Sequence, residues 1–341
     1  MSGRGTDGPD ESRDSGRGGY DDRSGSGFGP DSTTDEVLRG MDLTGRRYLV
    51  TGSSGGLGAE TARALTAHGA TVVMAARDES KNRAVRDSIV AAHPRASLES
   101  VRLDLGDLAS VRAACDSLLA AGRVFDGVVN NAGVMATPEG RTIDGHETQF
   151  GVDHLGHFLL VRGLLPLLRG RVVCVSSAGH RMSDIDLSDV DFERRTYDPL
   201  VAYGAAKTAN VLHAVGIDRR FAERGIRGIA IHPGGIHTEL GRYMTPDVVR
   251  SLMAMISDQP TALTWKSVEA GAATQVWALT SPFLDGRGGV YCEDCDVSPV
   301  VRDTTSVNGR GVAAYAVDPS RADHLWEISE RLVDRPATGR N

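Results

Sequence analysis

Tyr203 and Lys207 are the residues whose types and spacing point most directly to chemistry. Four residues apart on a helix, the two side chains would lie on one face. A phenol titrates near pH ~10 and a neighbouring ammonium favours the phenolate, so Tyr203 is a candidate proton donor or acceptor. Small apolar flanks are typical of a packed helix and argue against a chance surface pair: Ala205, Ala206, Ala209, Val211 and Leu212.

A glycine-rich turn earlier in the chain could bind the cofactor that such chemistry needs. An apolar strand at 45–50 precedes Thr51-Gly52-Ser53-Ser54-Gly55-Gly56-Leu57-Gly58, and an alanine-rich helix and a strand at 71–76 follow. Glycines between a strand and a helix let backbone amides approach a pyrophosphate at the positive end of the helix dipole. A simple tight turn is the alternative, but the strand–helix–strand context favours a dinucleotide site.

The end of the second strand indicates which dinucleotide binds. Sites for NAD place an acidic residue there to hold the ribose 2′-hydroxyl, whereas sites for NADP use arginine for the 2′-phosphate. This chain has Ala76 and then Arg77, with no acidic residue at the strand tip. Arg77 stays charged and can bind phosphate bidentately, although it could also be an ordinary surface arginine. The sequence therefore favours NADP(H), with NAD(H) left open.

Strands and helices then alternate along the chain. Helices are expected at 80–92 and 108–121, and strands at 98–103 and 127–129. The alternation predicts one α/β domain, a Rossmann-type doubly wound parallel sheet of about seven strands with helices on both faces. Ligands bind at the carboxyl ends of such strands, where Asp104 and Asn131-Ala132-Gly133 fall. Turn formation is the alternative role for these residues.

Composition narrows the class of protein. The chain has 341 residues and a net charge of -7, and the acidic balance argues against nucleic-acid binding. The sequence contains no run of about 18 apolar residues, so no membrane span is predicted. The N-terminus lacks an apolar signal core. Four cysteines are too few for a disulfide framework, so a cytoplasmic setting is expected. The Gly/Ser/Asp/Arg-rich residues 1–40 are expected to be a disordered tail, 41–335 the catalytic domain and 336–341 a flexible C-terminus.

Several polar residues have competing interpretations. In a helix predicted over 147–168, His154 and His157 are three apart but lack a third metal ligand, so packing or surface roles are expected. Cys292 and Cys295 likewise lack a second cysteine pair, and no metal site is predicted. Ser177 follows a strand at 171–175, where it could bond a substrate oxygen in the cleft or cap a helix.

Taken together, these motifs resemble those of the short-chain dehydrogenases/reductases of the single-domain kind, and within them the chain is similar to the retinol-dehydrogenase-like branch. The resemblance covers residues 45 to about 333, with the motifs in the family's order. They are Thr51-Gly52-x-x-x-Gly56-x-Gly58, Asn131-Ala132-Gly133, Ser177, Tyr203-x-x-x-Lys207, His232-Pro233-Gly234 with Thr238, and Leu325-Trp326-Glu327-Ile328-Ser329. One motif alone would be weak, whereas the ordered set is specific.

The resemblance implies hydride transfer between a nicotinamide and a carbonyl or alcohol carbon of a small molecule. Tyr203 would act as general acid or base, Lys207 would lower its pKa and hold the nicotinamide ribose, and Ser177 would orient the substrate oxygen. Asp104 would bind the adenine. The implied cofactor site comprises Gly52, Ser54, Gly56, Leu57, Gly58, Arg77, Asp104, Leu105, Asn131, Ala132, Gly133, Tyr203, Lys207, Pro233, Gly234 and Thr238.

Asp153 departs from the family's pattern, which usually has an asparagine at this position. In the family the asparagine helps to hold a water in the proton relay to the lysine. Ionised aspartate cannot donate a hydrogen bond, but it could accept one from that water or raise the pKa of Lys207. Asp153 is therefore retained as a candidate catalytic residue.

The substrate and the assembly are less specified. Family placement makes 239–264 the substrate lid, and its Met and Leu residues favour a lipophilic substrate, although such residues also build ordinary cores. Retinoids, steroids, aliphatic ketones and secondary-metabolite intermediates all stay open. The resemblance implies a homodimer through the helices that carry Asp153 and Tyr203. Alternatives are a nucleotide-bound sensor or scaffold without turnover, and a reductase of carbon–carbon double bonds on the same fold.

Overall fold

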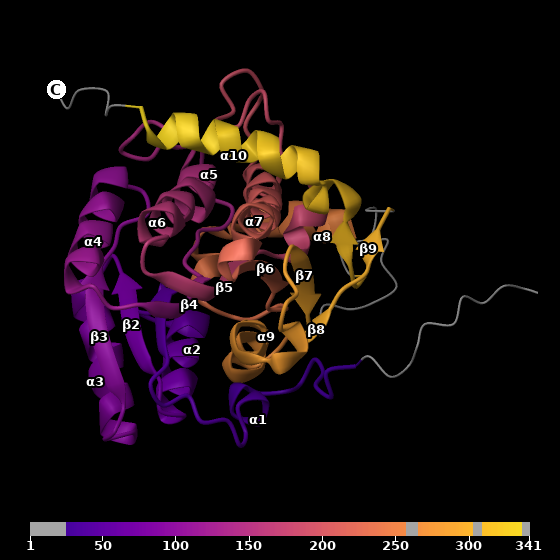
Figure 1. Cartoon of the computed structure of the whole chain (residues 1–341). Helices are drawn as coiled ribbons and strands as arrows, with labels where there is room; N and C mark the ends of the chain where they lie inside the picture. The colour runs from indigo at the N-terminus through magenta and orange to yellow at the C-terminus, as the bar shows by residue number, and fades with distance from the viewer. Residues whose placement is uncertain (1–24, 257–264, 303–308, 336–341) are drawn as a thin grey trace, which may run out of the picture.

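A computed structural model describes residues 25–256, 265–302 and 309–335, which form a sheet between two layers of helices (Figure 1). The strand order is β3-β2-β1-β4-β5-β6-β7-β8. The strands are β1 Arg47–Thr51, β2 Thr71–Ala76, β3 Ser97–Arg102, β4 Phe125–Asn130, β5 Leu168–Val175, β6 Ile226–His232, β7 Val290–Glu293 and β8 Asp296–Val297. The first seven are parallel and the short β8 is antiparallel to β7. The predicted doubly wound sheet is confirmed, with one strand more than expected.

The helices cover both faces of this sheet, as predicted. They are α1 Thr34–Val37, α2 Gly56–Ala67, α3 Glu79–Ala92, α4 Leu108–Ala121, α5 Thr148–Phe150, α6 Gly156–Leu164, α7 Pro199–Phe221, α8 Pro246–Ile256, α9 Val268–Thr280 and α10 Pro319–Val333. Short β9 Val300–Val301 and β10 Val312–Ala313 form a separate ribbon, which the sequence did not reveal. No helix among the described residues is long and apolar enough to cross a membrane.

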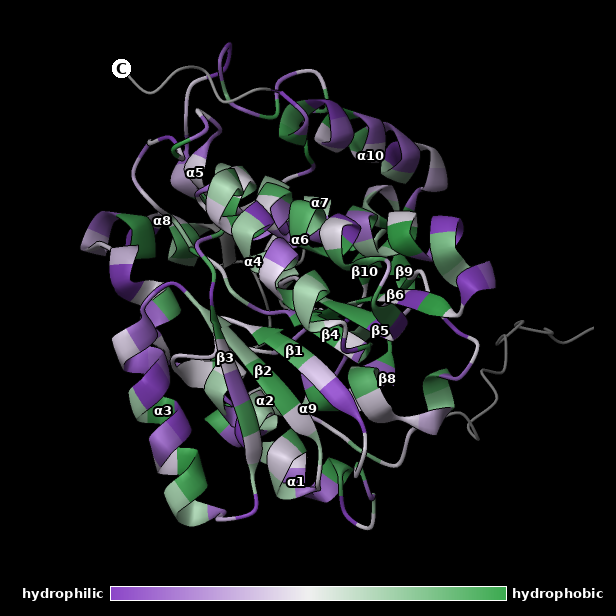
Figure 2. Ribbon diagram, turned by 60° about the vertical axis from the view of Figure 1, so that its left-hand side comes forward, coloured by the Kyte–Doolittle hydropathy of each residue, from purple (hydrophilic) through white to green (hydrophobic). Residues whose placement is uncertain are grey.

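Strand β1 shows how one sequence supplies two cores. Successive side chains of a strand point to opposite faces of a sheet. Leu49 joins the core formed with α4, α6 and α7, whereas Tyr48 and Val50 join the core formed with α2 and α9. Figure 2 shows the apolar central strands inside, with hydrophilic residues concentrated on outer helices such as α3 and α10. A strand that is apolar on both faces is therefore held in place by both helical layers.

The helix predicted over 147–168 is three consecutive segments. Between α5 and α6 the chain forms the π-helix η1 Gly151–Leu155, a wide turn often found at functional sites. The helix ends at Leu164, and Pro166 cannot continue it because proline lacks the amide hydrogen that the helical ladder needs. The prediction was too long at its C-terminus, where Leu168 already begins β5.

The prediction of a disordered tail to residue 40 is wrong for α1. Thr33 and Glu36 form a reciprocal capping box at the start of this helix, and Arg63 of α2 pairs with Asp35 at 2.8 Å. Val37 is buried against the core around α9. A cap and a few apolar residues suffice to dock a short helix on an existing surface. Residues 1–24, the rest of the expected disordered tail, and 336–341, the expected flexible C-terminus, lie outside the described residues.

Helix α10 covers the surface on which a dimer was expected. It packs on α7, and its Trp326 ring lies 4.8 Å from the Phe158 ring of α6 and 4.6 Å from the Arg220 guanidinium of α7. All but one of the α7 residues 200–217 are buried within the single chain. The chain's own C-terminal helix therefore covers part of the surface on which the dimer was expected, and the homodimer itself stays a prediction.

Candidate active site

The glycine-rich turn lies between β1 and α2 at the carboxyl edge of the sheet. Two of its glycines allow close backbone approach. A Cβ on Gly58 would lie 2.4 Å from the Gly52 carbonyl oxygen, and one on Gly52 would lie 2.8 Å from the Ala132 Cα. Gly55 begins α2 with no side-chain cap, and a Cβ there would meet nothing within 4 Å. The first amides of α2 thus face an uncrowded turn, a site that suits the phosphates of a dinucleotide.

Replacing Gly58 by alanine is expected to destabilise the protein by about 1–3 kcal/mol, because the added methyl overlaps backbone. Gly55→Ala is the matched control, since its methyl would enter open space. Chemical denaturation of both variants checks this expectation. Equal stability of the two variants would contradict the close packing of this turn.

Asn131, directly after the neighbouring strand β4, is bound to Thr51 at the end of β1 and so holds the start of the turn in place. The Asn131 side-chain nitrogen donates to the Thr51 carbonyl at 2.8 Å, and the Thr51 hydroxyl accepts from the Asn131 and Ala132 amides, each at 2.9 Å. Gln275 of α9 donates to the Asn131 side-chain oxygen at 3.1 Å. The structure therefore places Asn131 beside the predicted cofactor turn with its side chain already engaged by protein.

Tyr203, Lys207 and Ser177 are brought together beside this turn, although Ser177 is distant from the other two in sequence. Tyr203 and Lys207 are both only 3% exposed, and the Lys207 ammonium lies 5.5 Å from the Tyr203 ring centre. Ser177 hydrogen-bonds the Tyr203 phenol and also accepts from the Gly179 amide at 3.0 Å. It thus serves both as a helix cap and as a neighbour of the phenol, so the two interpretations of Ser177 are compatible.

Gly179 fits this arrangement because it has no side chain. A Cβ there would lie 2.9 Å from the Tyr203 ring. It belongs to the 3₁₀ turn η2 Ala178–Arg181, which follows β5 and lies against α7. The turn that Ser177 caps therefore packs directly against the Tyr203 ring, which places the serine close to the phenol.

Electrostatics at the phenol differ from the simple expectation. Burial raises the pKa of Tyr203, and the Lys207 ammonium and the Ser177 hydrogen bond oppose this shift without overcoming it. The lysine does favour the phenolate, as predicted, but Asp153 adds a negative charge that raises the pKa of Tyr203 further. Lys207 therefore does not bring the pKa of Tyr203 below its ordinary value, because desolvation is the larger effect.

Asp153 forms an ion pair with Lys207, with its carboxylate oxygen 2.9 Å from the ammonium nitrogen. Its other oxygen accepts from the Val134 amide at 2.8 Å. The carboxylate is fully buried, and burial raises its pKa while Lys207 opposes the shift. The sequence suggested an effect of Asp153 on Lys207, and the structure shows direct contact.

Comparison with known proteins decides the family. The family model for short chain dehydrogenases matches residues 46–248. The chain is a short-chain dehydrogenase/reductase. A Streptomyces lividans protein named as an oxidoreductase is 45% identical over 298 residues, covering 84% of this chain and 97% of that protein.

Two further matches extend the comparison. The short-chain dehydrogenase/reductase prx1 of Penicillium roqueforti is 38% identical over 296 residues, covering 84% of each chain. A crystal structure of an uncharacterised Mycobacterium paratuberculosis protein superposes with a TM-score of 0.69 at 32% identity, covering 91% of this chain and 100% of that chain. The family and the fold are thereby confirmed, whereas the retinol-dehydrogenase-like branch stays a prediction.

The remaining predicted cofactor residues of this dehydrogenase line the same edge of the sheet. Arg77 is exposed directly after β2. Asp104 follows β3 and accepts from the Gly106 amide at 3.0 Å, so it also forms a turn. Leu105 is buried, Ser54 and Leu57 are half-buried in the glycine turn, and Gly133 adjoins Asp153.

The loop after β6 closes the other side of the turn. Gly234 has a φ of +99°, which favours glycine, and a Cβ there would lie 2.8 Å from the Lys266 side chain. Thr238 caps the 3₁₀ turn η4 Glu239–Tyr243, and a Cβ on Gly56 would lie 3.4 Å from its methyl. Pro233 is buried between β6 and this loop. The described part of the predicted lid is η4 and α8, and residues 257–264 lie outside the described residues.

Several supporting residues escaped the sequence analysis. Gln275 orders Asn131 from 144 residues away, and His157 lies 2.8 Å from the Thr51 hydroxyl. Neither contact has a local sequence signal. His154 and His157 are buried with hydrogen-bond partners, in line with the expected packing roles. Cys292 lies in β7 and Cys295 between β7 and β8, and both are buried free thiols.

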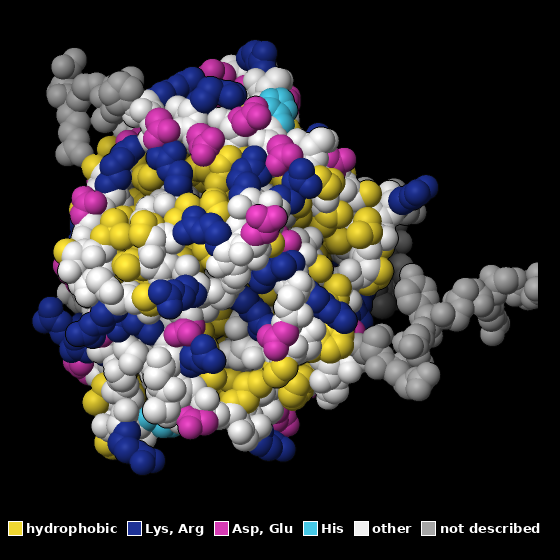
Figure 3. Space-filling model, in the orientation of Figure 1, with side chains coloured by type: hydrophobic (Ala, Val, Ile, Leu, Met, Phe, Trp, Pro, Cys, Tyr) yellow, Lys and Arg dark blue, Asp and Glu magenta, His cyan; other side chains and the backbone are white. Residues whose placement is uncertain are grey.

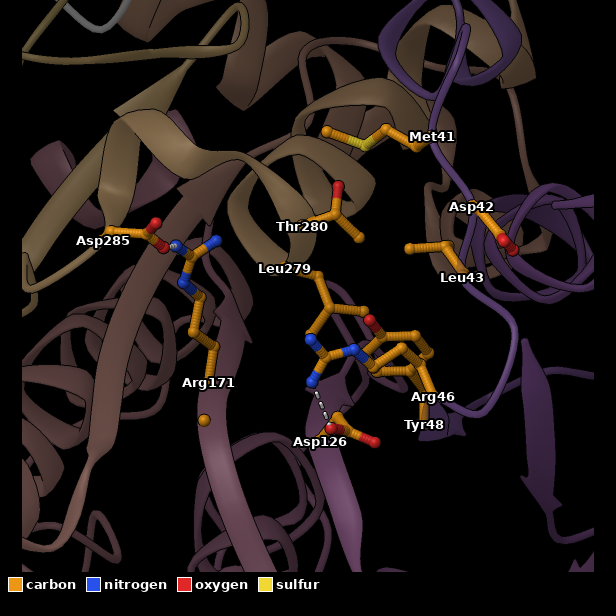
Figure 4. A pocket seen from close by; sticks show the side chains of 11 residues that line it. Met41, Asp42, Leu43, Arg46, Tyr48, Asp126, Arg171, Leu279, Thr280 and Asp285 are labelled. Atoms are coloured by element: carbon orange, nitrogen blue, oxygen red, sulfur yellow. Dashed lines mark hydrogen bonds and ion pairs between the residues drawn. The ribbon is translucent and has the colours of Figure 1, made fainter. Parts of the chain in front are cut away.

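A hollow with a volume of about 340 Å³ lies at the opposite, amino edge of the sheet (Figure 4). Arg46 pairs there with Asp126 at 2.8 Å, and Arg171 pairs with Asp285 at 2.8 Å. These charges compensate one another within the hollow. On the molecular face in Figure 3, basic and acidic side chains are likewise interspersed.

Proposed function

We propose that this dehydrogenase uses NADP(H) to interconvert a carbonyl and an alcohol, with Tyr203 as the general acid or base. The observation that carries the proposal is the buried contact of Tyr203 with Ser177 and Lys207 at the carboxyl edge of the sheet, the edge at which α2 starts without a side-chain cap. A buried phenol keeps its proton until a neighbouring group develops negative charge and can accept it. The nearby ammonium then stabilises the phenolate that is left. A carbonyl oxygen under reduction is such a group.

The chain's residues handle the proton and the developing charge. The bound nicotinamide would supply a hydride, two electrons and one hydrogen, to the carbonyl carbon. As the carbon–oxygen π bond becomes an alkoxide, Tyr203 donates its hydroxyl proton to that oxygen and is left as a phenolate. Lys207 stabilises the phenolate, and Ser177 hydrogen-bonds the oxygen that reacts. The reverse reaction uses the Tyr203 phenolate as the base.

The lid supports a lipophilic substrate. Tyr243 of η4 and Val249 and Met253 of α8 are exposed apolar side chains, with Met253 44% exposed. Such residues can adapt to apolar ligands of different shapes because the methionine side chain is flexible.

The four free cysteines support a reducing, cytoplasmic compartment for this enzyme.

Arg77→Glu is expected to raise the KM for NADPH by about tenfold or more, because it removes a bidentate phosphate contact and adds repulsion. The KM for NADH should change by less than about twofold, since NADH lacks the 2′-phosphate. Steady-state kinetics with both cofactors check this expectation. Arg83→Glu, an exposed position on α3, is the matched charge control. Equal loss with both cofactors would contradict the proposed phosphate contact.

The experiment that tests the function is cofactor consumption by purified protein with a panel of lipophilic aldehydes and ketones. NADPH consumption with formation of the matching alcohol is the expected result. Saturation of a conjugated carbon–carbon double bond instead would favour the double-bond reductase. Tight NADPH binding without turnover across the panel would favour a sensor or scaffold.

A further inference from the structure

Asp153 is built into the site as a fixed carboxylate. It lies in the π-helix η1, is fully buried, and is held by the Val134 amide at 2.8 Å and the Lys207 ammonium at 2.9 Å. Gly133 makes room for it, since a Cβ there would lie 3.2 Å from one carboxylate oxygen. These contacts leave the carboxylate one position, against the lysine that faces the phenol.

The charge of this carboxylate changes what the lysine can do. An ammonium beside a phenol favours loss of the phenol's proton, and a carboxylate beside the same ammonium cancels much of that effect. The cancellation is strong here because the ion pair is shielded from water. Burial is the larger cause of the raised pKa of Tyr203, and the Asp153 charge adds to it.

Within the described part of the chain, other ionisable groups also interact electrostatically with this cluster. Glu147 comes from the start of α5, His157 from α6, Arg242 from η4 and Tyr291 from β7. Burial lowers the pKa of His157 to about 4 and raises the pKa of Tyr291 well above its ordinary value, so both stay neutral near neutral pH. Burial also raises the pKa of Glu147, and Arg242 is an exposed cation. The ion pair of Asp153 and Lys207 is therefore the pair of opposite charges that lies nearest to the phenol.

We propose that Asp153 is a positioning residue that neutralises Lys207 and thereby keeps Tyr203 protonated, which favours proton delivery and hence carbonyl reduction. The inference rests on the proposed function, because it assigns the phenol to proton transfer. An asparagine at the same position would hold the lysine by its amide oxygen without cancelling its charge. The carboxylate therefore extends the pH range over which the site can act as an acid, and restricts its use as a base.

Titration of the phenol itself provides the test. Protein labelled with ¹³C at the tyrosine Cζ carbons is titrated by NMR without cofactor, and Tyr203→Phe identifies the Tyr203 signal among the seven tyrosines. Asp153→Asn is expected to lower the Tyr203 midpoint by about one pH unit or more. Asp323→Asn, which removes a distant carboxylate paired with Arg219, should leave the midpoint unchanged. An unchanged midpoint in folded Asp153→Asn would overturn the inference.

Kinetics provide an independent arm. In Asp153→Asn, the alkaline limit of carbonyl reduction and the rising limb of alcohol oxidation should both move to lower pH by the shift seen in the titration. If the asparagine variant does not fold, Asp153→Ser removes the same charge with a smaller side chain and is held to the same expectation. A Tyr203→Phe variant with full turnover would refute the proposed function, whereas the cofactor-free titration would still decide the role of Asp153.

Discussion

Replacing Tyr203 by phenylalanine is expected to lower kcat for carbonyl reduction by about 10³-fold, within the range that a positioned general acid contributes. The substitution removes one hydroxyl from a side chain that is only 3% exposed, and it leaves the ring packing against Gly179 in place. Although the resemblance also counts Tyr203 among the cofactor residues, the affinity for NADPH should stay within about twofold, because the hydroxyl mainly supplies a proton and the remaining cofactor residues are unchanged.

Single-turnover rates and NADPH fluorescence titrations measure these two quantities separately. Tyr197→Phe is the matched control. The Tyr197 hydroxyl accepts a hydrogen bond from the Gln149 side chain at 3.0 Å, and no hydrogen bond among the described residues joins it to Lys207. A Tyr203→Phe enzyme within tenfold of the parent rate would show that another group supplies the proton. Loss of NADPH binding instead would assign the phenol to the cofactor site.

Replacing Lys207 by methionine is expected to abolish turnover and to lower the free energy of unfolding by about 3–5 kcal/mol, the cost of stranding a buried charge. The stranded group is Asp153, whose side chain has no exposed surface. Adding Asp153→Asn should recover most of the lost stability, because no buried charge is then left unpaired. The double variant should stay inactive, since the phenolate still lacks its cation.

Chemical denaturation and kinetics of the two variants make this comparison. Lys266→Met is the matched control: its partner Asp294 lies 2.5 Å away but is 37% exposed, so water can solvate the carboxylate that is left. A small loss of stability is expected there. Equal losses for Lys207→Met and Lys266→Met would contradict the buried ion pair, and so would a double variant no more stable than Lys207→Met.

Local signals account for the parts of the fold that could be predicted. The turn from Gly52 to Gly58 and the spacing of Tyr203 and Lys207 are short-range patterns, and each follows from the geometry of one strand or helix. Alternating strands and helices then leave few sheet topologies, so the doubly wound arrangement follows as well. The placement of Ser177 beside the phenol depends on that topology, since it puts the ends of parallel strands at one edge.

Long-range contacts account for what could not be predicted. Gln275 reaches Asn131 across 144 residues, and no pattern near either residue announces the pair. Trp326 stands in one of the motifs found in the sequence, but its packing on Phe158 and Arg220 is visible only once α10 is placed over α7. The effect of burial on the Tyr203 pKa likewise depends on the whole surrounding fold.

Transfer of deuterium from NADPH labelled at C4 tests the central claim most directly. The protein is incubated with labelled cofactor and the ketones or aldehydes that it consumes, and the products are examined by mass spectrometry and NMR. The account predicts one deuterium on the carbinol carbon of the alcohol, and a rate of labelling about 10³-fold lower with Tyr203→Phe. Deuterium on a carbon that was part of a carbon–carbon double bond, or undiminished labelling with Tyr203→Phe, would contradict it.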